Sequence, residues 1–94
     1  MIEWTEQASR HLDQAYDFIS VENSEDVAAE IVTRIVNTVE RLAVFPLSGR
    51  PGRVAGSREL VISRTPFIVA YAVAKSNVTI LAVYHGAQRW PDRI

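Results

Sequence analysis

The residues of this 94-residue chain that could perform chemistry lie mostly in its second half. His85 ends a run rich in β-branched residues, and Arg89 follows four positions later. A histidine beside arginines can accept a proton and stabilise charge on phosphorus, which cleavage of RNA through its 2′-hydroxyl requires. A histidine in this place can equally be structural, hydrogen-bonded to the turn that follows. Both interpretations of His85 stay open at this point.

A cluster of arginines precedes the apolar runs of the second half. Its members lie within fifteen positions: Arg50, Arg53, Arg58 and Arg64. Guanidinium groups form bidentate hydrogen bonds with phosphates and carboxylates, so the cluster could contact nucleic acid or an acidic partner protein. The alternative is a solvated surface on which the last two of these arginines bond to helix acids such as Glu22 or Asp17.

Other familiar chemistries are excluded by the sequence. It contains no glycine-rich phosphate loop, no HExxH or GxSxG motif and no cysteine, so disulfides, thiolate metal sites and cysteine nucleophiles are excluded. We therefore expect neither a metal nor another cofactor. His11 is expected to be a solvent-exposed helix residue, and Trp90 with Pro91 to anchor the tail rather than to stack on bases.

The first half of the chain is predicted to form a helical hairpin. Thr5 can cap a helix over residues 6–21, and Asn23 or Ser24 can cap a second helix that Pro46 stops. Apolar side chains recur every three or four residues in both segments, which places them on one face of each helix. Because only a few residues join the two helices, we expect them to be antiparallel.

The rest of the chain predicts a sheet. A short apolar start, Ile2 to Trp4, is a candidate strand, and Leu47 to Ser57 is a long loop. Three β-rich runs follow, separated by short turns: Glu59–Arg64, Phe67–Ala74 and Val78–His85. Short turns favour an antiparallel meander. The predicted fold is one α+β domain over residues 1–94, in the order β-α-α-β-β-β, with the hairpin packed on a mostly antiparallel sheet.

The middle run is apolar on both faces, which is typical of a central strand. The hairpin can cover one face of the sheet, whereas the tail, residues 86–94, is short and has Trp90 as its single large apolar group. We therefore expect a partner to cover the other sheet face or the helix–sheet groove, and so to stabilise a domain this small.

Charge is divided along the chain although the net charge is only −1. Residues 1–40 contain nine acids and two bases, a net charge of −7, and residues 41–94 contain eight bases and two acids, a net charge of +6. This asymmetry favours an anionic partner; alternatively, acidic helices and a basic sheet neutralise each other. The acidic N-terminus and the absence of a long apolar stretch predict no signal peptide, no membrane span and a cytoplasmic location.

Four stretches of the chain resemble the sequence pattern of the ParE/RelE toxin superfamily. They are Phe45–Pro46 with Gly49–Arg50, Gly56 to Val61, Pro66 to Tyr71, and Val78 to Ala87 followed by Arg89 to Pro91. The resemblance spans essentially the whole chain. It implies the toxin of a type II toxin–antitoxin system, of the kind linked to plasmid stabilisation. It also implies a cognate antitoxin bound in a hetero-oligomer, which alone contacts operator DNA.

The resemblance leaves two targets open. ParE-like members inhibit DNA gyrase, whereas RelE-like members cut mRNA on the ribosome and tend to be strongly basic. One lysine and a pI near 6.1 favour gyrase, with a ribosome-dependent mRNA interferase as the alternative and an inactive, antitoxin-binding member as the third possibility.

In the nuclease branch the matching residues would be Arg58, Arg64, Tyr84, His85 and Arg89. The lysine and glutamate positions that some nucleases use before the sheet are unmatched at Pro46–Gly49. Residues expected to contact target or antitoxin are Arg50, Arg53, Arg58, Arg64, Phe67, Tyr71, Arg89 and Trp90.

Overall fold

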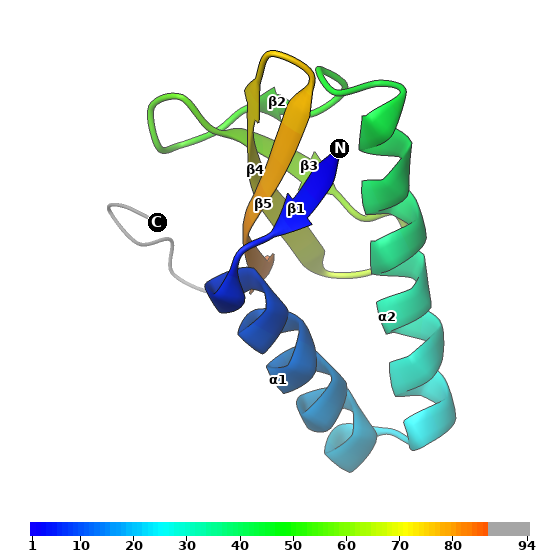
Figure 1. Cartoon of the computed structure of the whole chain (residues 1–94). Helices are drawn as coiled ribbons and strands as arrows, with labels where there is room; N and C mark the ends of the chain where they lie inside the picture. The colour runs from blue at the N-terminus through cyan, green and yellow to red at the C-terminus, as the bar shows by residue number, and fades with distance from the viewer. Residues whose placement is uncertain (87–94) are drawn as a thin grey trace.

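A computed structural model of the chain describes residues 1–86, so the predictions for Arg89 and Trp90 lie outside the described residues. The elements are β1 (Ile2–Trp4), α1 (Glu6–Glu22), α2 (Glu25–Glu40), the 3-10 helix η1 (Arg41–Ala43), β2 (Arg50–Pro51), β3 (Arg58–Val61), β4 (Phe67–Ala74) and β5 (Asn77–His85). Five strands form one sheet in the order β1-β5-β4-β3-β2, in which only the β1–β5 pairing is parallel. The predicted α+β architecture is confirmed (Figure 1).

The helical hairpin forms where the caps predict it. The Thr5 hydroxyl accepts a hydrogen bond from the Ala8 amide at 3.0 Å, and Ser24 does the same for the Val27 amide at 3.1 Å. The predicted end of the second helix at Pro46 is wrong, because α2 ends at Glu40 and the chain tightens into η1. Among the described residues no helix is long and apolar enough to cross a membrane.

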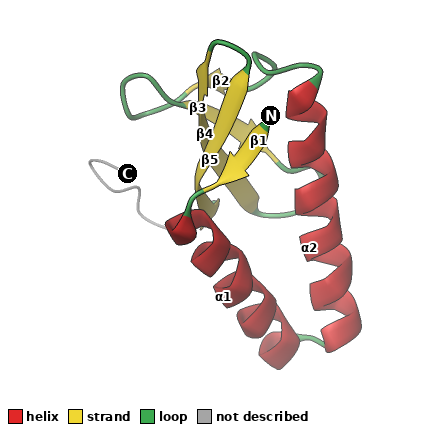
Figure 2. Ribbon diagram, viewed as in Figure 1, coloured by secondary structure: helices red, strands yellow, loops and turns green. Residues whose placement is uncertain are grey.

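The sheet has β4 near its centre, as the two-faced apolar pattern predicts. Val69 and Tyr71 are fully buried, and both helices lie on one side of the sheet (Figure 2). The run predicted from Glu59 to Arg64 is shorter, since residues 62–66 form a turn that the Ile62 amide closes by donating to the Phe67 carbonyl at 3.0 Å. The two-residue strand β2 lies inside the segment predicted to be loop.

A β-bulge divides β5 at the point where β1 ends. Ala70 pairs with Ala82 but Tyr71 pairs with Ile80, so Leu81 has no partner residue on β4. Bulges locally bend a strand and increase its twist. Here the bend separates the first half of β5, which β1 covers, from the second half, whose outer edge meets α1.

Candidate functional site

Helix α1 takes the place of a neighbouring strand along the second half of β5. The Thr5 amide donates to the Ile80 carbonyl at 3.0 Å, which ends the β1–β5 ladder. Beyond it the Gln7 side-chain amide donates to the Leu81 carbonyl at 3.0 Å, and His11 Nδ1 accepts a hydrogen bond from the Val83 amide at 3.2 Å. Side chains of α1 thus satisfy backbone groups that a strand would otherwise pair.

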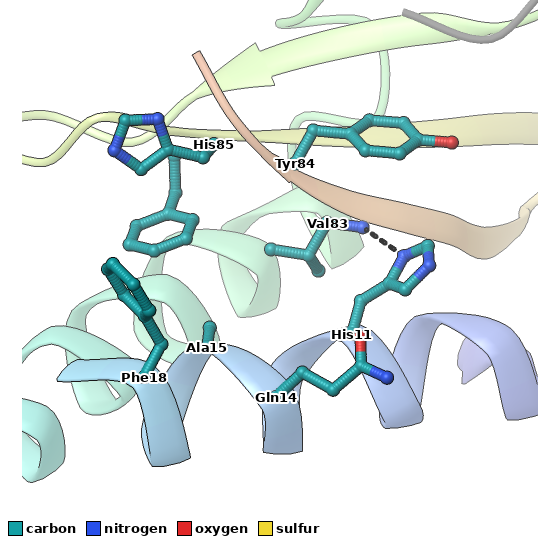
Figure 3. Close-up of a pocket in the computed structure, with 8 residues that line it drawn as sticks. His11, Gln14, Ala15, Phe18, Val83, Tyr84 and His85 are labelled. Atoms are coloured by element: carbon teal, nitrogen blue, oxygen red, sulfur yellow. Dashed lines mark hydrogen bonds between the residues drawn. The ribbon is translucent and has the colours of Figure 1, made fainter. Parts of the chain in front are cut away.

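A groove of about 480 Å³ opens between α1 and the end of β5. Figure 3 shows the α1 residues on one side and the strand on the other, with the His11–Val83 bond at one end. The Phe67 and His85 rings meet edge to face, 5.6 Å apart, and the His11 and Tyr84 rings are 5.5 Å apart. The groove is lined by His11, Gln14, Ala15, Phe18, Phe67, Val83, Tyr84 and His85.

The ionisable rings at one end of the groove are held in their neutral forms. Partial burial, and then the positive charge of Arg10, lower the pKa of His11 below 6.5. Partial burial also raises the pKa of Tyr84 above 10.0. At neutral pH His11 therefore keeps Nδ1 free of a proton to accept the Val83 bond. With Phe18 and Val83 beside them, these neutral rings suit apolar side chains of a partner.

The expectation that His11 is solvent-exposed is wrong, because the side chain is half-buried and bonded to the sheet. Its partner, Val83, is 72 residues away along the chain. Helical periodicity describes only which face of α1 a residue occupies, so it gives no information on a strand edge beside that face. The available signal was the short spacing from the first strand to the cap at Thr5, which forces α1 to start beside the sheet.

Two arginines of the predicted cluster are held by one buried carboxylate. Glu59 is only 4% exposed, and its Oε1 accepts hydrogen bonds from Arg50 Nε and Nη2 at 3.2 and 3.1 Å. Its Oε2 accepts from the Arg53 amide at 3.0 Å. A buried carboxylate must be satisfied in this way. The Arg50 guanidinium therefore helps to stabilise the loop that connects β2 to β3.

The other two arginines are placed apart from the helix acids that the alternative interpretation invoked. Arg58 Nη1 donates to the Gly49 carbonyl at 2.8 Å, where it supports the loop after η1. Arg64 is exposed in the turn before β4, with a φ of 63°. Among the described residues, neither Arg58 nor Arg64 forms an ion pair with Asp17 or Glu22.

The candidate nuclease residues are brought together only in part. Tyr84 and His85 are consecutive at the end of β5, and Arg64 lies in the turn before Phe67, which pairs with His85. Arg58 instead pairs with Tyr71. The two pairs are four positions apart on β4, a distance of roughly 13 Å along the strand. Arg58 is therefore not positioned to act on the same phosphate as His85.

The two aromatic residues predicted to contact a partner are both buried, although one of them reaches the groove. Phe67 lines the groove, whereas Tyr71 is 0% exposed and its hydroxyl bonds within the fold. In residues 1–86 no three histidine, aspartate or glutamate side chains gather closely enough to hold a metal ion. The described part of the chain thus offers an apolar groove and a loop held by arginines as its candidate functional features.

The chain has recognisable similarity to characterised groups of proteins. Residues 2–90 match the family described as the ParE toxin of the type II toxin–antitoxin system parDE. The Sinorhizobium fredii (strain NGR234) protein Y4kP, to which its name ascribes a toxin function, is 43% identical over 91 residues, covering 97% of this chain and 93% of that protein. The fold resembles a chain of the chromosomal ParDE system from P. aeruginosa, with a TM-score of 0.82 and 31% identity, over 89% of this chain and 92% of that one.

Proposed function

This chain belongs to the ParE family of type II toxin–antitoxin toxins, and from that premise we propose that it inhibits DNA gyrase by binding it and that a cognate antitoxin neutralises it. Inhibition by binding needs a presented surface and no acid–base chemistry. The proposal therefore depends on what the candidate residues do within the fold.

The observation that carries the gyrase proposal is that two arginines of the cluster, Arg50 and Arg58, are held in structural bonds. Arg50 is committed to buried Glu59, and Arg58 to the Gly49 carbonyl, four residues of β4 away from the His85 level. Phosphoryl-transfer catalysis needs a proton acceptor and cations around one phosphate, because charge develops there in the transition state. A cation bonded elsewhere contributes little to such a site.

The groove between α1 and β5 supports the antitoxin part of the proposal. It has apolar walls at Phe18, Phe67 and Val83, and Phe18 is 59% exposed. Exposed apolar surface of this kind is typical of a site that a partner covers. We propose that an apolar segment of the antitoxin occupies this groove. Because bound antitoxin would occlude one side of the toxin, it would also limit access of the toxin to its target.

One sample assayed two ways tests the proposed target. Purified toxin is added to a gyrase supercoiling reaction and, separately, to ribosomes translating a defined mRNA. We expect supercoiling to be inhibited, or cleaved DNA to be trapped, while the mRNA stays intact. Cutting of mRNA within codons, with supercoiling untouched, would establish the interferase alternative instead.

The variant His85→Ala supplies the matching genetic test. If the toxin acts by binding, growth inhibition should be largely retained in this variant, provided circular dichroism shows that it still folds. Acid–base catalysis by a histidine contributes roughly 10²–10⁴-fold to a rate. A hundredfold or greater loss of toxicity in a folded variant would therefore contradict the binding mechanism.

A further inference from the structure

The loop between η1 and β2 exposes large apolar side chains. Val44 is 72% exposed, Phe45 63% and Leu47 62%, and all three lie within four consecutive positions. Scattered apolar residues on a surface need no explanation, but adjacent ones on one loop cost solubility. We call residues 44–47 the apolar loop. Its composition suggests that it is covered when the protein acts.

A buried tyrosine fixes the conformation of the apolar loop. The Tyr71 hydroxyl donates to the Pro46 carbonyl at 2.9 Å and accepts from the Gly49 amide at 2.9 Å. A Cβ added to Gly49 would lie 2.6 Å from that hydroxyl oxygen and 2.7 Å from the Glu59 carbonyl oxygen, so only glycine fits there. The central strand thereby holds the loop at Pro46 and again at Gly49, two residues after its end.

Further bonds close the loop from its other side. Arg58 donates to the Gly49 carbonyl at 2.8 Å, and the Phe45 amide donates to the Arg41 carbonyl at 2.9 Å. The Ser48 amide donates to the Phe45 carbonyl at 3.1 Å. A surface that is already ordered loses little conformational entropy when it binds. These bonds therefore present outward apolar side chains in a shape suited to docking.

Positive charges lie at the end of the molecule that holds the apolar loop. Arg41 is exposed one turn before Phe45. The turn between β4 and β5, whose residues include exposed Lys75, lies at the same end of the molecule as the loop after η1 (Figure 1), and the N-terminal ammonium of Met1 donates to the Ser76 carbonyl in this turn. The nearest acid in sequence is Glu40, at the end of α2. Most acids of the chain belong to the helical hairpin, whose turn lies at the opposite end of the molecule.

We propose that the apolar loop, with Arg41 beside it, is the surface by which the toxin docks on its target protein. The inference rests on the proposed function and adds the surface through which it operates. The complementary partner is an apolar depression on a protein, rimmed by carboxylates, because apolar burial supplies affinity and the rim supplies orientation. A nucleic acid fits this surface less well, since Phe45 and Leu47 offer nothing to a phosphate.

The double variant Phe45→Ser/Leu47→Ser tests the docking surface. Both side chains are mostly exposed, so the fold should persist, and a thermal melt checks that it does. We expect inhibition of gyrase supercoiling to need at least tenfold more variant than wild-type protein. Antitoxin affinity should be unchanged, because the proposed antitoxin groove lies four residues away along β4. Val21→Ser is the matched control, since Val21 is 85% exposed on α1, and it should inhibit like wild type.

A second part of the experiment tests the contribution of charge to docking. Raising the salt concentration should weaken wild-type inhibition, and Arg41→Ser should weaken it at low salt and reduce the further loss at high salt. Unchanged inhibition by the double variant, or a loss of antitoxin affinity in place of a loss of inhibition, would overturn the assignment of the apolar loop.

Failure of the gyrase proposal would be seen separately, in the wild-type protein. If wild-type toxin leaves supercoiling untouched, growth inhibition becomes the measurement for the same variants. Loss of toxicity in the double variant but not in Val21→Ser would support docking on another protein target. Equal toxicity of all three proteins would overturn the inference as well.

Discussion

At the scale of single residues, the shape of this protein depends on pairs that are far apart in sequence. Tyr71 and Gly49 form one such pair, in which the phenol fills the space that any larger residue would need. His11 and Val83 form another, in which a helix side chain completes the edge of a strand. Each pair connects a candidate binding segment, helix α1 or the apolar loop just before Gly49, with the strand that supports this segment.

The His11 bond predicts a pH dependence of stability. The pKa of His11 is lowered in the folded protein, so between that value and 6.5 the unfolded chain binds more protons. Stability from this group is therefore full above pH 6.5, falls as the pH drops through that value, and levels off below the folded pKa. The side chain is partly exposed, so we expect a modest effect.

The variant His11→Gln isolates this effect, because glutamine can accept the Val83 bond without titrating. The free energy of unfolding is measured with urea from pH 8 to pH 5 for both proteins. Wild type should lose more stability than the variant as the pH falls, because every other titratable group is common to both proteins. A difference that stays flat with pH would show that the His11 ring does not titrate with folding.

Candidate functional residues could be chosen from the sequence, but the residues that they contact within the fold could not. The arginine cluster and Phe67 were chosen as candidate contact residues from residue type and position, and their role in binding stays a prediction. The Arg50–Glu59 pair and the burial of Tyr71 could not be predicted, because they depend on which strands become neighbours. Tyr71 was expected to meet a partner since its strand is apolar on both faces, and the structure places it on the face that the helices cover.

At the scale of elements, the strand β2 is the least self-sufficient part of the sheet. It has two residues, one of them a proline, and pairs only with the start of β3. Its position is fixed by the Glu59 carboxylate, which bonds Arg50 on β2 and the Arg53 amide in the following loop. Side-chain bonding substitutes here for the ladder that so short a strand cannot form.

The variant Glu59→Gln should therefore loosen residues 50–57 more than the rest of the molecule. A neutral amide weakens the bond to Arg50, and its NH₂ group can face the Arg53 amide donor to donor. We expect a loss of about 1–3 kcal/mol, the usual effect of a disrupted buried bond to a charged group. Hydrogen exchange should be faster at the Arg53 amide and unchanged in the helices. In a separate limited proteolysis experiment, trypsin should cleave faster after Arg53.

Glu3→Gln provides the matched control, because Glu3 is an exposed acid on the opposite edge strand. It should change the free energy of unfolding by less than about 0.5 kcal/mol, as surface substitutions do. Equal protection of residues 50–57 in wild type and Glu59→Gln would show that backbone pairing alone holds β2.

Periodicity and turn chemistry predicted both α-helices and four of the five strands in residues 1–86, with errors at the ends of these elements and one short strand missed. Thr5 and Ser24 located the helix starts, and the short turns located the hairpins. The end of α2 was predicted too late, since the sequence up to Pro46 keeps the apolar stripe while the backbone tightens to bring Leu42 into the core. The strand β2 was missed because Pro51 and the glycines around it are typical of loops.

At the scale of the whole molecule, charge and apolar surface are distributed unevenly. The hairpin segment, residues 1–40, has a net charge of −7, and the remaining residues have +6. The groove between α1 and β5 lies where these two parts meet. An antitoxin segment that enters the groove with apolar side chains can therefore place its acidic residues over the basic part of the chain.

The thermodynamics of antitoxin binding should reflect both contributions. A lasting interface buries on the order of 1,000 Å² or more, and apolar burial gives a negative heat-capacity change. We expect affinity of about nanomolar or better, weakened only partly between 0.05 and 0.5 M salt, because screening removes the charge contribution and leaves the apolar one. Titration calorimetry at several temperatures and salt concentrations measures both.

A groove variant separates the apolar contribution from general effects of the charged surface. Phe18→Ser removes an exposed ring from the groove wall and should weaken antitoxin binding about tenfold or more while making the heat-capacity change less negative. Val21→Ser, on the same helix but outside the groove lining, should change neither. A near-zero heat-capacity change in wild type, with affinity collapsing in salt and Phe18→Ser binding normally, would mean that charge drives association. The antitoxin would then have to lie on the basic part of the chain, over the arginines of β2, of β3 and of the loop between them.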